Sequence, residues 1–284
     1  LMRIAIASGK GGTGKTFLAV NLALKAAETQ TTLLMDLDVE EPNGGIFIQG
    51  DDAETHKVTR AIPSWDPGSC NLCGKCINWC KFNALIKLGE MILVMPPLCH
   101  SCYACSELCP MQALPMEQQS LGEIRHLQLG KLDFTESKLD IGLEQSSPLI
   151  ERTLEFADEH FAEKELQLLD SPPGTACAMV SAVKTVDYVI LISEPTPFGL
   201  FDLNLAVETV RQLNLPFSVV INRDGIGNND IYKYLQKEGI TLLAKIPHQR
   251  EIAELYSHGE IIYRKVPAVD QALEQILSKI RSLS

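Results

Sequence analysis

The sequence predicts an α/β protein with a doubly wound, mostly parallel sheet, interrupted by a small inserted domain. Continuously apolar segments typical of buried strands alternate with segments whose apolar residues recur at helical spacing. Between Pro63 and Gln119 this alternation stops, and the sequence becomes rich in cysteines and turns. We therefore expect a main domain formed by residues 1–62 and 120–284, and an inserted domain at residues 63–119.

The chain opens with a strand, a loop and a helix. MRIAIAS (2–8) is predicted to be a buried strand, a glycine-rich turn follows, and FLAVNLALKAAE (17–28) has helical spacing. TTLLMDLD (31–38) is a second buried strand. Further strands are expected at 166–170, 186–193, 217–222 and 241–247, and helices around 199–213 and 228–238. Parallel strands need such helical crossovers, so this order is typical of a doubly wound sheet.

Two other segments are expected to belong to the main domain. Residues 120–142 alternate in polarity, which favours extended chain or a hairpin returning from the insertion. The segment 267–283 is expected to be a helix with one apolar face formed by Val269, Leu273, Ile276, Leu277 and Ile280. A membrane-surface anchor is the alternative, but only Lys279 and Arg281 are basic. We expect this helix to pack on the core.

Composition excludes some classes of function. With 45% hydrophobic and 21% charged residues, the 284-residue chain is typical of a globular protein. Its formal charge of −11 argues against a nucleic-acid partner, since such binding draws on lysine and arginine. No apolar run reaches the roughly 18 residues of a membrane helix, so we expect no stable membrane insertion. Eight of the nine cysteines have metal-ligand spacing and no signal peptide is evident, which favours a cytoplasmic protein.

A phosphate-binding loop, GKGGTGKT, lies between the first strand and the first helix. Its glycines let backbone N–H groups point at phosphate oxygens, and the helix start adds a partial positive charge. Lys15 is expected to reach the β- and γ-phosphates of ATP, and the Thr16 hydroxyl to bind magnesium. The residues expected to contact the nucleotide here are Gly9, Lys10, Gly11, Gly12, Thr13, Gly14, Lys15 and Thr16.

Lys10 makes the loop more specific than the general pattern. KGGTGKT, with this second lysine, resembles the deviant phosphate loop of the MinD, ParA and nitrogenase iron-protein class of ATPases. The resemblance implies that Lys10 reaches the phosphates bound by a second copy of the chain. It therefore implies a homodimer that forms when ATP binds.

Carboxylates follow two of the predicted strands. Asp36 and Asp38 end the second strand, where such groups can hold magnesium and orient the attacking water. We expect Asp36 to bind magnesium and Asp38 to position water, with turn formation or helix capping as the structural alternative. LLDSPPGT resembles the switch II segment of the class, so Asp170 is expected to act in catalysis and on magnesium. VVINRD resembles the adenine-contacting segment and implies a base contact by Asn222.

The expected catalytic residues are Lys10, Lys15, Asp38 and Asp170.

The cysteines form two runs of C-x2-C-x2-C-x3-C, each cysteine recurring 29 positions later. In two-cluster bacterial ferredoxins such a run supplies three ligands to one iron–sulfur cluster and the fourth to the other. The first expected cluster is bound by Cys70, Cys73, Cys76 and Cys109. The second is bound by Cys99, Cys102, Cys105 and Cys80. Zinc is the main alternative, since C-x2-C pairs also build tetrahedral zinc sites. The ninth cysteine, Cys177, is a small buried residue or a further redox or metal contact.

Over nearly its whole length the sequence resembles MinD-superfamily ATPases that carry an inserted ferredoxin domain. The resemblance implies two 4Fe-4S clusters, ATP and magnesium, and a dimeric switch that serves electron transfer or iron–sulfur and metallocofactor assembly with a client protein. One alternative is a MinD-like recruitment or scaffolding protein with structural or sensing clusters. Another is a ligase of the cobyrinic acid diamide synthase type, which is expected to need a glutaminase domain for which this sequence leaves no room.

Overall fold

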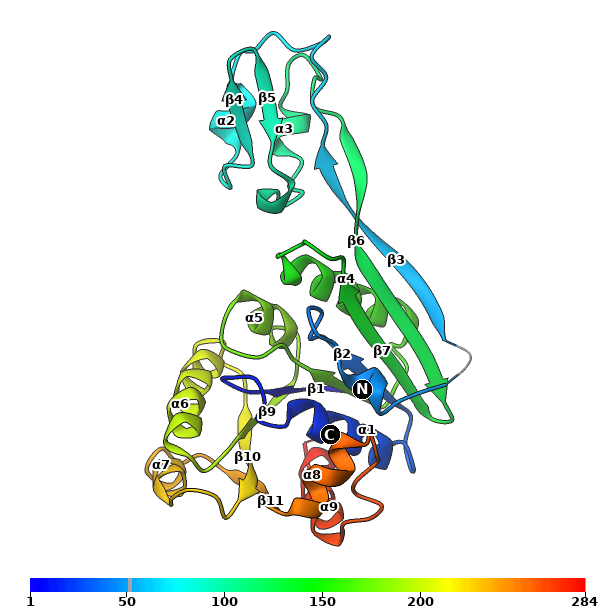
Figure 1. Cartoon of the computed structure of the whole chain (residues 1–284), viewed down its shortest axis with the longest axis vertical. Coiled ribbons are helices and arrows are strands. Elements are labelled where there is room, and N and C mark those ends of the chain that lie inside the picture. Colours follow the sequence, from blue (N-terminus) through cyan, green and yellow to red (C-terminus); the bar gives the residue numbers. More distant parts are fainter. Residues whose placement is uncertain (51–52, 284) are drawn as a thin grey trace. The chain divides into compact units, whose positions relative to one another are not determined.

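A computed structural model describes residues 1–50 and 53–283 (Figure 1). The chain divides into two compact units. The first comprises Leu1–His56, Ile124–Lys138 and Ser146–Ser284, and the second comprises Lys57–Glu123 and Leu139–Gln145. The segments 57–62, 120–123 and 139–145 thus belong to the second unit, whereas the sequence analysis assigned them to the main domain. The loop at 140–145 carries little apolar pattern that could have indicated this.

The sheet has nine strands among the described residues, in the order β11-β10-β9-β1-β8-β2-β7-β6-β3. The strands are β1 (Met2–Ala7), β2 (Thr32–Asp36), β3 (Glu54–Pro63), β6 (Met116–Leu129), β7 (Leu132–Leu139), β8 (Leu166–Asp170), β9 (Tyr188–Ser193), β10 (Phe217–Asp224) and β11 (Leu242–Pro247). From β11 to β7 every described pairing is parallel. The predicted doubly wound, mostly parallel α/β fold is therefore confirmed. β6 and β7 are neighbours, so the hairpin expected around 120–142 is also present.

Helices connect the strands of the first unit. They are α1 (Lys15–Ala26), α4 (Ser146–His160), α5 (Cys177–Val183), α6 (Pro197–Gln212), α7 (Asp230–Lys237), α8 (Arg250–Ser257) and α9 (Pro267–Arg281), with a 3-10 turn, η1 (Gly44–Ile46). The predicted apolar face of α9 is buried in one core cluster with residues of α1 and of strands β1, β2 and β8. The expectation that this helix packs on the core is confirmed. None of the described helices is long and apolar enough to cross a membrane.

The second unit contains short elements around the cysteines. These are α2 (Lys75–Trp79), the antiparallel pair β4 (Leu85–Leu88) and β5 (Met91–Val94), a 3-10 turn η2 (Pro96–Leu98) and α3 (Ala104–Glu107). The sequence repeat of 29 residues is also a structural repeat. Asp66 N in the first half donates a hydrogen bond to Ala113 O in the second half. The equivalent residues of the repeat are Met95 and Ala84, and Met95 N in the second half donates to Ala84 O in the first half. Each half of the repeat therefore donates a backbone hydrogen bond to the other half.

Candidate functional site

The phosphate loop joins β1 to α1 with the geometry that its glycines predict. Gly12 and Gly14 have φ angles of 75° and 100°, in the left-handed region that other residues rarely adopt. A Cβ atom at Gly14 would also lie 2.3 Å from the Asn222 side-chain nitrogen. Gly14 is the N-cap of α1, so the loop presents the first backbone N–H groups of the helix to a phosphate.

Asn222, at the carboxyl end of β10, supports this loop. Its Nδ2 atom donates a hydrogen bond of 2.9 Å to the Thr13 carbonyl, and its Oδ1 atom accepts one of 2.9 Å from Arg223 N. The side chain is buried, with 7% of its surface exposed. Asn222 therefore ties β10 to the phosphate loop. Its role as a contact to the adenine base stays a prediction.

The two lysines of the loop lie in different surroundings. Lys15 is buried, which lowers its pKa, while Asp170, Asp38 and Asp36 act in the opposite direction. Its ammonium group thus faces the carboxylates expected to handle magnesium and water.

Lys10 is about one-third exposed, and its Nζ atom lies 4.0 Å from Asp202 Oδ2 on α6. A Cβ atom at Gly9 would lie 2.1 Å from the Asp202 carbonyl oxygen, so α6 and the loop are in close contact. Sequence reasoning missed Asp202, since no motif marks it. Its carboxylate gives the partly exposed Lys10 a nearby anion within the same chain.

Asp36 and Asp170 are paired residues at the ends of neighbouring parallel strands, β2 and β8. Asp36 accepts hydrogen bonds from the backbone N atoms of Asp38, Asn43 and Gly44, at 3.1, 2.9 and 2.8 Å. Burial nevertheless raises the pKa of Asp36 to about 6. Burial also raises the pKa of Asp38, although Lys15 acts against the rise.

Asp170 is buried, and neither of its carboxylate oxygens has a hydrogen-bond partner of normal geometry among the described residues. Burial, followed by the charge of Asp36, raises its pKa well above the usual range, while the nearby Thr16 hydroxyl lowers it. Unpaired buried carboxylate oxygens are the ligands that magnesium prefers. The residues present thus fit the expected cation, which Thr16, Asp36 and Asp170 would hold. When bound with nucleotide, it would neutralise charge on the phosphates.

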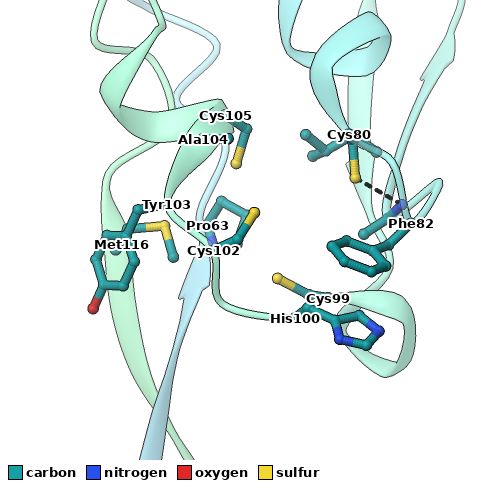
Figure 2. A pocket seen from close by; sticks show the side chains of 12 residues that line it. Pro63, Cys80, Phe82, Cys99, His100, Cys102, Tyr103, Ala104, Cys105 and Met116 are labelled. Atoms are coloured by element: carbon teal, nitrogen blue, oxygen red, sulfur yellow. Dashed lines mark hydrogen bonds between the residues drawn. The ribbon is translucent and has the colours of Figure 1, made fainter.

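Two pockets in the second unit each collect four cysteines. One is lined by Cys80, Cys99, Cys102 and Cys105, and the other by Cys70, Cys73, Cys76 and Cys109. Each contains about 360 Å³ of empty space, part of it open to solvent. Figure 2 shows the first pocket, in which sulfur atoms from separate chain segments point toward one shared space. These groupings are the ones expected from the crossed ligand pattern of the sequence.

Backbone geometry repeats around the sulfur atoms. N–H groups of Leu72 and Ser101 donate to Cys70 Sγ and Cys99 Sγ, both at 3.4 Å. The N–H groups of Ala84 and Ala113 do the same for Cys80 and Cys109, at 3.3 and 3.4 Å. The positive-φ residues also recur 29 positions apart, as Leu72 and Ser101, Gly74 and Tyr103, and Asn83 and Gln112. Such N–H groups stabilise negative charge on sulfur.

The pKa values indicate what the thiols need from a ligand. Burial raises the pKa of Cys76 and Cys99, and raises that of Cys105 to about 11. A positively charged metal centre would be required to hold these sulfurs as thiolates. Among the described residues, no group of three or more His, Cys, Asp or Glu side chains is placed to bind one metal ion.

Cys177 does not belong to either pocket. It is exposed and is the first residue of α5. The sequence analysis gave a buried position as its structural alternative, and this was wrong because the side chain lies at the open start of the helix. Its role as a redox or metal contact stays a prediction.

Comparisons with known proteins agree with this architecture. The family of CobQ/CobB/MinD/ParA nucleotide-binding domains matches residues 4–262, and the chain belongs to this family. It therefore has a nucleotide-binding P-loop ATPase domain, as its fold and its phosphate loop indicate.

Particular relatives extend over nearly the whole chain. Protein MJ0579 of Methanocaldococcus jannaschii is 30% identical over 92% of this chain and 91% of its own length. An iron-sulfur cluster carrier protein of Pyrococcus horikoshii is 21% identical over 99% of this chain and 87% of its own. Among solved structures, the septum site-determining protein MinD of Pyrococcus horikoshii, complexed with Mg-ADP, has a TM-score of 0.62 at 18% identity, covering 100% of this chain and 98% of that one.

Proposed function

We propose that this protein is an ATP-hydrolysing dimeric switch that carries two 4Fe-4S clusters and acts in electron transfer or in iron–sulfur and metallocofactor assembly. The observation that carries the proposal is the presence, in one chain, of a P-loop site and of two pockets that each gather four cysteines. Relatives named iron-sulfur cluster carrier proteins support the second half of the proposal. The reduced thiols it requires suit the cytoplasm.

The pockets favour clusters over zinc. Each pocket gathers cysteines from both runs, three from one run and one from the other. The crossed origin of the ligands is the arrangement of two-cluster ferredoxins, and the N–H groups directed at sulfur are among the features that tune such clusters. The proposed inserted domain, residues 63–119, lies within the second compact unit.

The ATPase site would work through charges that this chain supplies. Loop N–H groups and Lys15 would bind the β- and γ-phosphates, and Asp38 would orient the attacking water. Lys10 would leave Asp202 and contact the nucleotide of a second copy, which makes the dimer depend on ATP. Loss of the γ-phosphate would release the segment after Asp170 and reopen the dimer. A client protein would then receive electrons or clusters.

A redox titration monitored by electron paramagnetic resonance tests this proposal. Anaerobically reconstituted protein should contain about eight iron and eight sulfide per chain. The titration is then run with ADP and with a non-hydrolysable ATP analogue. We expect the nucleotide to change a potential or a line shape, and the Lys15→Ala variant to lose this response while keeping its iron. Identical titrations in the wild type would instead favour a MinD-like recruitment device in which the clusters serve structure or sensing.

A further inference from the structure

Arg60, on β3, is buried within the cysteine-rich unit. Its side chain contacts three neutral oxygen atoms of the same unit. Nη1 donates to Gln145 Oε1 at 2.5 Å and to the Cys99 carbonyl at 3.4 Å, and Nη2 donates to the Pro96 carbonyl at 3.2 Å. The guanidinium group is thus fixed beside the chain segment that enters the pocket of Cys80, Cys99, Cys102 and Cys105.

Among the residues that the structure describes, the charge of Arg60 has no carboxylate partner. Within the described ranges 1–50 and 53–283, no Asp or Glu oxygen lies within 4.0 Å of its nitrogen atoms, and its Nε atom is buried without a hydrogen bond. Buried cations are normally paired, because the loss of hydration is costly. We therefore expect the negative charge that pairs with Arg60 to come from a metal centre bound by the cysteine thiolates of this pocket.

Among the described residues that line the other pocket, no buried cation is present. The repeat places Gly89, which has no side chain, 29 positions after Arg60. The two halves differ here because the chain turns between β4 and β5 just after Leu88, whereas the segment around Arg60 continues as strand β3 as far as Pro63. The cation that lines the pocket of Cys70, Cys73, Cys76 and Cys109 is Lys75, which is exposed and therefore screened by water.

We propose that Arg60 makes the two clusters inequivalent, giving the cluster of Cys80, Cys99, Cys102 and Cys105 the higher reduction potential. The inference rests on the proposed function. Reduction adds one electron, supplied by an external reductant, to a group that four thiolates already make negative, and no bond to Arg60 forms or breaks. A fixed cation in a poorly polarisable interior favours that added charge, and a guanidinium group keeps its proton. An electron that enters the unit would therefore reside on this cluster.

The test is a redox titration of the reconstituted full chain and of Arg60→Gln. In the variant we expect the potential of one cluster to fall enough to change its reduced-to-oxidised ratio at least tenfold, which is 59 mV for one electron. The other cluster should be unchanged, and Arg60→Lys should recover most of the shift. Lys75→Gln makes the same charge change beside the other pocket at an exposed site, and we expect a much smaller effect. Unchanged potentials in Arg60→Gln, or equal shifts of both clusters, would overturn the inference.

A second measurement keeps Arg60 intact and does not depend on that variant folding. Cys73→Ser and Cys102→Ser alter equivalent exposed ligands of the two pockets. We expect Cys102→Ser to change the spectrum of the higher-potential cluster and Cys73→Ser that of the lower one. Two equal potentials in the wild type, or the opposite assignment, would refute the role of Arg60. Absence of iron and sulfide after reconstitution would instead refute the proposed function, so the two failures are distinguishable.

Discussion

Replacing Asp170 by asparagine is expected to stabilise the nucleotide-free protein while weakening its binding of magnesium and ATP. Asp170 is buried and is paired in register with Asp36, and it has no hydrogen bond of normal geometry to lose among the described residues. Neighbouring strands are about 4.8 Å apart, and two charges at that distance repel by about 3 kcal/mol at an effective dielectric constant of 20.

The sign of the pH dependence follows from the raised pKa values. A carboxyl group with a raised native pKa keeps a proton that the unfolded chain has released, so stability falls as the pH rises from about 4 to the native pKa. Asp170→Asn should therefore increase the free energy of unfolding by about 3 kcal/mol at pH 8, and by less at pH 5.

Urea unfolding followed by far-ultraviolet circular dichroism measures this gain, in buffer free of magnesium and nucleotide. Isothermal titration calorimetry should show at least a tenfold loss of affinity for ATP with magnesium, and a much smaller change for ADP with a chelator present. A variant that is less stable than the wild type at pH 8 would refute the reasoning, because Asp170 would then be stabilising the empty site.

Three further predictions concern the loop and the repeat. Lys10→Ala should bind nucleotide as a monomer and lose the ATP-dependent dimer, which light scattering detects; a persisting dimer would contradict the role of Lys10. Asn222→Ala leaves the Thr13 carbonyl without its buried partner and should cost about 1–3 kcal/mol in nucleotide affinity, measured by calorimetry. An unchanged affinity would show that the loop keeps its shape unaided. Tyr103→Gly should stabilise the metal-free second unit by about 1 kcal/mol in tryptophan-monitored unfolding, since it relieves a φ of 63°, whereas Gly74→Ala should destabilise it.

Local patterns predicted the parts of the site that lie close together in sequence. The phosphate loop needs glycines and a lysine at fixed spacing, and the cysteine runs impose their own backbone turns. The apolar strands were found because both faces of a central parallel sheet are buried. The amphipathic helix α4 was not predicted, although Leu149, Ile150, Thr153, Leu154 and Ala157 give it a regular buried face.

Long-range contacts could not be predicted in the same way. Asn222 reaches the phosphate loop across 209 residues, and Gln145 reaches Arg60 across 85. No spacing rule connects such positions, since their contact depends on the strand order. β3 was missed as well, because its first four residues are polar and mostly exposed, and only Val58 and the last four residues are buried. Without β3, nothing in the sequence indicates that Arg60 is buried.

The two units share one physical feature that relates their sequence to their proposed chemistry. Asp170 is a buried carboxyl without a donor of normal geometry, and Arg60 is a buried cation without a carboxylate, in both cases among the residues that the structure describes. Each arrangement lowers the stability of the protein by itself, and each would be offset by a ligand of opposite charge: magnesium with nucleotide for Asp170, and an anionic thiolate-bound cluster for Arg60. Residues that cost stability and lie beside a ligand pocket are better explained by binding than by folding.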